Sequence, residues 1–150
     1  MKGTLLLGAL IPLFYSCENG EEGLRYGRTD FIFFNKSSYT IDIEGYCYDS
    51  KLLNVHLPVD SDTCVSESIK GRTEIFDLLR VYDSLKITFN DGTFLSSTGL
   101  ENELKFVNLS NYSIEEKSNG HHIATYTFTN ADYEYAKQKL AEREANNGGE

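Results

Sequence analysis

The chain has 150 residues, with 14 Lys and Arg against 23 Asp and Glu, so its net charge at pH 7 is −9. This length suits one domain, and the acidic excess argues against binding nucleic acid or anionic lipid through a general electrostatic field. A net charge of this size also keeps a protein soluble, and solubility is the simpler explanation of it.

The first recognisable pattern ends at Cys17. Lys2 precedes an apolar run over residues 4–14, and Ser16-Cys17 follows that run. A basic start, an apolar run of about 7–15 residues and a small residue at the break are typical of a secretory signal. The run is too short to span a membrane, which takes roughly 20 apolar residues. We therefore expect residues 1–16 to be an export signal.

The break itself resembles the processing site of bacterial lipoproteins, which are cut before a cysteine that is then acylated. Ser16 and Cys17 fit that pattern, whereas Phe14 and Tyr15 stand where many family members have leucine and a small residue. Looser versions occur in Bacteroidota lipoproteins. The resemblance implies cleavage before Cys17 and a lipid anchor on it. The alternative is an ordinary cleaved signal, which would leave a soluble secreted protein.

An acidic stretch with several glycines follows the cysteine. Glu18, Glu21 and Glu22 resemble the cluster that directs Bacteroidota lipoproteins to the outer cell surface. This resemblance implies an outer-membrane lipoprotein on the cell surface, with the periplasmic face as another location. The composition of residues 17–28 by itself predicts a flexible acidic tether.

Period-two apolar patterns dominate from Thr29 onwards. Residues 31–34 are apolar on both faces, as in a central strand, and Gly45 is expected to mark a bulge. Alternation predicts further strands around residues 39–43, 53–57, 64–69, 79–89 and 104–109, with 72–77 connecting two sheets.

The glycine of Asp91-Gly92 predicts a tight hairpin turn. Asp-Gly favours a two-residue type I′ turn, because both central residues of that turn have positive φ. The resulting register places Phe89 opposite Phe94 as a cross-strand aromatic pair.

The last hairpin offers two registers. A two-residue loop at Asn119-Gly120 would place Ile114 opposite Thr125 and split the apolar residues between two faces. A three-residue loop over residues 118–120 places Ile114 opposite Ala124 and keeps one apolar face, so we prefer it.

Strong helix formers close the chain. Thr129 can cap a helix over residues 131–145, and Asp132 serves its first turn. The apolar stripe is thin, since it contains only Tyr133, Ala136 and Leu140. We expect this helix to pack lightly on the rest of the domain.

Together these elements predict an all-β fold. We expect an antiparallel, immunoglobulin-like β-sandwich of about seven to nine short strands over residues 29–130, with one C-terminal helix and a frayed tail over 131–150. The chain also resembles small Bacteroidota lipoproteins of unknown function, in the strand of residues 82–89 with Asp91-Gly92 and in the closing segment 126–133. These motifs are structural, so the resemblance implies no activity.

The cysteines leave one pairing open. If Cys17 is acylated, Cys47 and Cys64 remain as an even pair in a compartment that permits disulfides. A bridge would stabilise the fold by about 3 kcal/mol in the chain-entropy model. Two free thiols are the alternative, because the pair must come within about 7 Å between Cα atoms to be joined. A metal site of these two cysteines with His56 lacks the C-x-x-C spacing that would support it.

The remaining histidines are the neighbours His121 and His122. Neighbours on a strand point to opposite faces, so these two cannot share one metal ion. In the preferred register His122 faces Glu116 and His121 faces Lys117. This placement indicates a solvated hairpin end.

No catalytic motif stands out. The chain lacks a nucleophile elbow, a phosphate-binding loop and a dinucleotide fingerprint. The pairs Glu21-Glu22 and Glu115-Glu116 are interpreted as tether and exposed strand rather than as a general acid and base. Asp60, Asp62 and Thr63 could hold calcium, but an acidic turn without metal is preferred. We therefore expect no catalytic residue, metal or cofactor.

Two weaker signals concern binding and modification. The 10 Tyr and 9 Phe could include a stacking platform for sugar or peptide, although packing in the core and at sheet edges explains them more simply. Asp83-Ser84-Leu85 matches the short O-glycosylation motif of Bacteroidota proteins. Ser84 is therefore a candidate glycosylation site, or merely the start of a strand.

Two functional classes follow. The first is a non-catalytic envelope lipoprotein, anchored in the membrane through Cys17, that binds an unidentified envelope protein or glycan or plays a structural part. The second is a small secreted hydrolase or inhibitor-type module whose site leaves no motif. A concave pocket with converging polar groups would favour the second class, and an exposed aromatic patch or sheet edge would favour the first.

Overall fold

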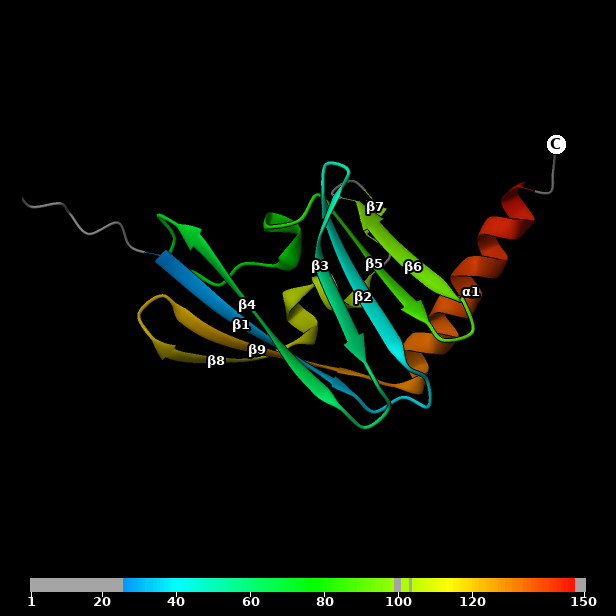
Figure 1. The fold of residues 1–150 in the computed structure, drawn as a ribbon, viewed down its shortest axis with the longest axis horizontal. Helices are drawn as coiled ribbons and strands as arrows, with labels where there is room; N and C mark the ends of the chain where they lie inside the picture. The colour runs from blue at the N-terminus through cyan, green and yellow to red at the C-terminus, as the bar shows by residue number, and fades with distance from the viewer. Residues whose placement is uncertain (1–25, 99–100, 103, 148–150) are drawn as a thin grey trace, which may run out of the picture.

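The computed structural model describes residues 26–98, 101–102 and 104–147 (Figure 1). Within these ranges the chain forms strands, short 3₁₀ helices and one α-helix. In chain order they are β1 (Tyr26–Asn35), β2 (Ile41–Cys47), β3 (Ser50–Leu57), β4 (Asp62–Lys70), η1 (Leu78–Arg80), β5 (Ser84–Phe89), β6 (Phe94–Thr98), β7 (Glu101–Asn102), η2 (Lys105–Val107), η3 (Leu109–Asn111), β8 (Ser113–Ser118), β9 (His121–Phe128) and α1 (Asn130–Asn147).

The strands form two sheets that pack against each other. Sheet A has the order β4-β1-β9-β8, and sheet B has the order β3-β2-β5-β6-β7. In Figure 1, α1 lies beside sheet B and extends away from the sandwich. The predicted mostly-β sandwich with a C-terminal helix is confirmed at this level.

The strand directions differ from the prediction in one pair. β1 runs parallel to β9, whereas the other pairs in the described ranges are antiparallel. β1 also lies inside its sheet, between β4 and β9. An immunoglobulin constant-type sheet has the order ABED, with the first strand at an edge. The expectation of a central strand at residues 31–34 is confirmed, but the fully antiparallel pairing is wrong, because the last strand adds beside the first.

The core lies between the sheets and follows the period-two pattern. Phe31 and Phe33 of β1 and Ile41 and Ile43 of β2 are fully buried, because alternate side chains of each strand face the opposite sheet. The ring of Phe33 meets that of Phe106 edge-on, with centroids 6.0 Å apart. The bulge expected at Gly45 is confirmed, since the β2–β3 register shifts between Gly45 and Tyr46.

The strand predicted over residues 79–89 is confirmed only over residues 84–89, and the strand predicted over residues 104–109 is replaced by 3₁₀ segments. Residues 78–80 form η1 ahead of β5, and residues 105–111 contain η2 and η3. Leu78 and Phe106 are nearly fully buried in these segments. Their apolar residues signal burial correctly, but a short apolar run does not distinguish a strand from another buried segment.

The β5–β6 hairpin has a longer turn than predicted. Thr88, not Phe89, lies opposite Phe94, and the Phe89 amide donates to the Thr93 carbonyl (2.8 Å). Residues 90–92 therefore form a three-residue loop, with Gly92 at φ +86°. This register brings Ile87 opposite Leu95, and both side chains are buried. The predicted Phe89–Phe94 pair is wrong, because it would have turned Leu95 away from the core.

The β8–β9 hairpin agrees with the preferred register beyond its turn. Ile114 lies opposite Ala124, and Glu116 lies opposite His122, as predicted. At the turn itself Ser118, not Lys117, lies opposite His121, so the loop is Asn119-Gly120 and the predicted three-residue loop is wrong. A register shift between Glu116 and Ser118 keeps Ile114 opposite Ala124 despite the shorter loop.

The ends of the domain differ slightly from the expected boundaries. β1 begins at Tyr26, so the last residues assigned to the tether belong to sheet A. The start of α1 has the Asp132 part of the expected cap: the Thr129 amide donates to Asp132 Oδ2 (2.8 Å), and the Thr129 hydroxyl donates to the same oxygen (3.0 Å). Tyr133 and Ala136 are buried while Leu140 is half-buried, which confirms a thin apolar stripe.

Candidate functional site

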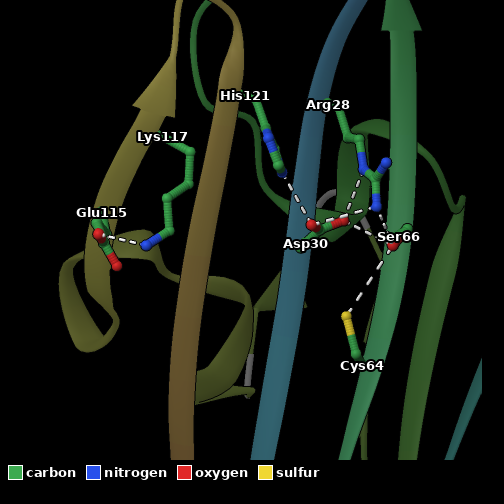
Figure 2. Close-up of polar contacts among 7 residues, drawn as sticks. All are labelled: Arg28, Asp30, Cys64, Ser66, Glu115, Lys117 and His121. Carbon is green, nitrogen blue, oxygen red and sulfur yellow. Dashed lines mark hydrogen bonds and ion pairs between the residues drawn. The ribbon is translucent and has the colours of Figure 1, made fainter.

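A polar cluster lies on the outer face of sheet A. Arg28 and Asp30 of β1 point away from the core, since Thr29 and Phe31 between and beyond them point into it. Ser66 of β4 is the direct partner of Asp30, and His121 of β9 is the direct partner of Arg28. The ladder therefore brings four polar side chains from three neighbouring strands together (Figure 2). We call Arg28, Asp30, Ser66 and His121 the outer-face cluster.

The Asp30 carboxylate is the centre of the outer-face cluster. Its Oδ1 accepts from Ser66 Oγ (2.6 Å) and from Arg28 Nε (2.8 Å). Its Oδ2 lies 2.8 Å from His121 Nε2 and 3.3 Å from Arg28 Nη2. An ionised carboxylate can only accept, so His121 donates its Nε2 proton here. Both carboxylate oxygens are thus bonded twice.

The contacts shift the acidity of Asp30. Burial alone would raise its pKa, but the hydrogen bonds from Ser66, Arg28 and His121, together with the guanidinium charge, outweigh burial and lower the pKa to about 2. The Asp30 side chain is 13 % exposed, whereas Arg28 is 53 % exposed. The charged carboxylate is therefore the stable form of Asp30 at any ordinary pH.

The order of these contacts decides what the cluster can do chemically. In a hydrolytic triad, the serine hydroxyl is bonded to a histidine that removes its proton. Here the Ser66 hydroxyl donates to Asp30, and Asp30 lies between Ser66 and His121. A carboxylate with so low a pKa is a poor general base. The cluster is suited to holding β4, β1 and β9 together.

A cysteine extends the outer-face cluster along β4. Cys64 is exposed, and its Sγ lies 4.0 Å from Ser66 Oγ (Figure 2). Cys47 is half-buried at the end of β2, where its thiol donates to the Val81 carbonyl (3.1 Å). Both cysteines are free in this structure, on strands that belong to different sheets. The structure therefore does not join the pair for which a disulfide was considered.

The neighbouring histidines have structural partners on opposite faces. His121 contacts Asp30, and the Nε2 of His122 lies 3.0 Å from the Thr73 carbonyl oxygen. Both rings are half-buried. The expectation of opposite faces is confirmed. The expectation of a solvated hairpin end holds for the turn, where residues 117–119 are exposed, but not for the two histidine rings, because each has a protein partner.

The other candidate ligands lie apart. His56 is exposed and its Nδ1 lies 2.7 Å from Asp42 Oδ1 on the outer face of sheet B. Asp60, in the β3–β4 turn, pairs with Lys36 of the β1–β2 loop (3.2 Å). Ser84 is half-buried as the first residue of β5. Within the described part of the chain, no group of three or more His, Cys, Asp or Glu is arranged to hold a metal ion.

The predicted lipid anchor and the question of a membrane-spanning helix concern the ends of the chain and its helices. Cys17, with the acidic residues that follow it, lies outside them. Among the helices that the structure describes, none is long and apolar enough to cross a membrane.

Sequence reasoning did not predict the outer-face cluster. Asp30 stands just before the apolar run 31–34 and was not singled out. The available signal was the spacing Arg28-x-Asp30, which puts opposite charges on one face of a strand. Ser66 and His121 are 36 and 91 residues away from Asp30 in sequence, so only the strand order could show that they meet it.

Comparison with known proteins adds no identification. No protein-family model, no curated protein and no solved structure matches the chain.

Proposed function

We propose that this protein is a cell-envelope lipoprotein, anchored in the outer membrane through Cys17, that acts as a non-catalytic binding or structural module. The export pattern that ends at Ser16-Cys17 and the acidic residues Glu18, Glu21 and Glu22 support the location. The sandwich supports a module that works through its surface, because its interior is filled by packed side chains. The partner would be an envelope protein or a glycan.

One observation carries the non-catalytic part of the proposal. Ser66 and His121 both donate to Asp30. This arrangement leaves the hydroxyl without an effective base, because its acceptor is a carboxylate whose pKa of about 2 makes it a poor proton acceptor, and the His121 Nε2 proton points to the same carboxylate. The most connected polar group on the described surface is thus satisfied internally, as a structural contact would be.

The immunoglobulin-like type of the sandwich, which the sequence predicted, is part of the same proposal. An immunoglobulin-like domain presents its partners with loops at the ends of the sandwich. The strand order of sheet A differs from that type, with β1 in the interior. The proposed mode of action, contact through loop ends and sheet edges, depends on the sandwich and not on that order.

A small secreted hydrolase is the second candidate, favoured by the presence of Ser66, His121 and Cys64 on one face. It requires Asp30 to release one of its donors when substrate binds. The purified full chain should be screened with ester, peptide and glycoside substrates beside a His121→Ala variant. Turnover that His121→Ala abolishes would establish the hydrolase and end the non-catalytic proposal. We expect no turnover by either protein.

The anchor is tested separately by metabolic labelling with an alkynyl fatty acid. Wild type and Cys64→Ala should carry label, and Cys17→Ala should carry none. Cys64→Ala is the matched control, because Cys64 is the exposed cysteine of the described domain. Label that persists in Cys17→Ala would contradict acylation at that position. Protease treatment of intact cells then separates the cell surface from the periplasmic face.

A further inference from the structure

The β2–β3 hairpin carries the most exposed apolar side chains of the described domain. Tyr48 is 94 % exposed and Leu52 is 65 % exposed, more than the other large hydrophobic residues of the described ranges. Both lie within residues 46–52, which we call the hairpin tip. In Figure 1 the β2–β3 turn lies at the top of the view.

The side chains of Tyr48 and Leu52 reach solvent because the backbone is irregular at both positions. Cys47 pairs with Ser50, so Tyr48 and Asp49 form a two-residue turn, and Tyr48 has φ +51°. This left-handed conformation favours glycine or asparagine and is rare for a bulky residue. Leu52 is the extra residue of the bulge, because Lys51 pairs with Tyr46 and the next pair is Leu53 with Gly45. Bulges re-aim side chains, and this one leaves Leu52 in solvent.

Contacts from the segment before β5 hold the tip in place. The Tyr48 amide donates to Asp83 Oδ2 (2.6 Å), and the Asp83 amide donates to the Tyr46 carbonyl (2.8 Å). The Cys47 thiol donates to Val81 on the same segment. The aromatic side chain is therefore carried on a fixed backbone, which lowers the ordering entropy that a partner must overcome. Rigid, exposed aromatic residues are the usual anchors of protein interfaces.

The charge around the tip selects the partner. Asp49 and Asp83 are exposed, and neither has an ion-pair partner among the described residues. The nearby cation Lys51 is already paired with Glu44. The chain as a whole carries a net charge of −9, which disfavours a second copy of itself and favours a cation.

We propose that the hairpin tip docks a basic segment of another protein, in which Lys or Arg lies next to an apolar side chain. The apolar group packs on Tyr48 and Leu52, and the cation meets Asp49 and Asp83. This inference rests on the proposed function as a binding module and names its surface and the chemistry of its partner.

The test uses the full chain in detergent and three synthetic peptides of equal length. One alternates Leu with Lys, one alternates Leu with Glu, and one alternates Ser with Lys. We expect the Leu-Lys peptide to bind at least about tenfold more tightly than the other two. Tyr48→Gly and Leu52→Ser should each weaken that binding about tenfold or more. Tyr26→Ser is the matched control, because Tyr26 is also exposed (59 %) but lies on β1, and it should bind as wild type does.

Other outcomes overturn the assignment in distinct ways. Equal binding of the Leu-Glu peptide, or no binding of any peptide, would refute a basic partner. Leu-Lys binding unchanged in both tip variants would refute the hairpin tip while leaving a binding module. Self-association in sedimentation that Tyr48→Gly removes would assign the tip to a second copy instead. Substrate turnover in the screen above would remove the proposed function itself.

Discussion

The outer-face cluster on sheet A and the hairpin tip of sheet B both lie at the surface, but they differ in backbone and in side-chain contacts. The outer-face cluster lies on regular strands, and the side chains of Arg28, Ser66 and His121 all donate to the Asp30 carboxylate. The hairpin tip has a left-handed tyrosine and a bulge, and Tyr48 and Leu52 lie in solvent. The outer-face cluster thus has regular backbone and fully bonded side chains, whereas the hairpin tip has irregular backbone and two apolar side chains in solvent.

This difference separates residues that stabilise the fold from residues whose presence stability does not explain. The contacts of Asp30 stabilise the fold, because they join three strands and keep a charge paired. The conformation of Tyr48 does the opposite, since a non-glycine residue with positive φ costs about 1 kcal/mol. Stability therefore accounts for the outer-face cluster and does not account for Tyr48. Four predictions test that division, in order of decreasing effect.

Replacement of Asp30 should have the largest effect. Asp30→Ala leaves Arg28, Ser66 and His121 without their acceptor, so we expect it to lower the free energy of unfolding by about 2–3 kcal/mol in urea. Asp62→Ala is the control on the exposed end of the same sheet and should change it by less than about 0.5 kcal/mol. Peptide binding at the hairpin tip should be unchanged by both. A loss below about 1 kcal/mol for Asp30→Ala would show that the contacts are not structural.

Acid should remove the same contribution. The pKa of Asp30 is about 2 in the fold against an ordinary 3.8, so the stabilisation is present above the ordinary value. It is lost as the pH falls from about 4 towards 2, and it amounts to about 2 kcal/mol. The measurement compares urea unfolding of wild type and Asp30→Asn across this range. The difference between them should shrink as the pH falls, and a constant difference would contradict the low pKa.

Gly92→Ala measures the effect of a left-handed turn position. A Cβ at Gly92 has no heavy atom within 4 Å, so the positive φ is the sole source of strain. We expect a loss of about 1 kcal/mol in the free energy of unfolding. No loss would mean that such positions in this fold relax freely, and the strain assigned to Tyr48 would fall with it.

Tyr48→Gly should have the smallest effect on stability. Glycine accepts the left-handed conformation but adds freedom to the unfolded chain, so we expect a change between zero and a gain of about 0.5 kcal/mol. The same variant should lose peptide binding. A clear loss of stability would indicate that Tyr48 has a structural role and would erase the contrast with the outer-face cluster.

Local features were accessible from the sequence. The alternation around Ile41 and Ile43, the bulge at Gly45 and the cap at Thr129 were all predicted, because each depends on residues close together in the chain. The turn after Phe89 was missed although the same reasoning could have found it. The apolar-face test that selected the register of Ile114 would also have placed Ile87 opposite Leu95.

The sequence by itself determined that the chain is a mostly-β domain closed by a helix, since hydrophobic period and turn residues are local properties. Only the tertiary structure decided that β9 returns parallel to β1, because parallel neighbours are joined through long connections that leave no local pattern. That pairing brings His121 to Asp30. The turn conformation that exposes Tyr48 was likewise decided by the tertiary structure, because the Tyr48 amide donates to the carboxylate of Asp83, 35 residues away in sequence.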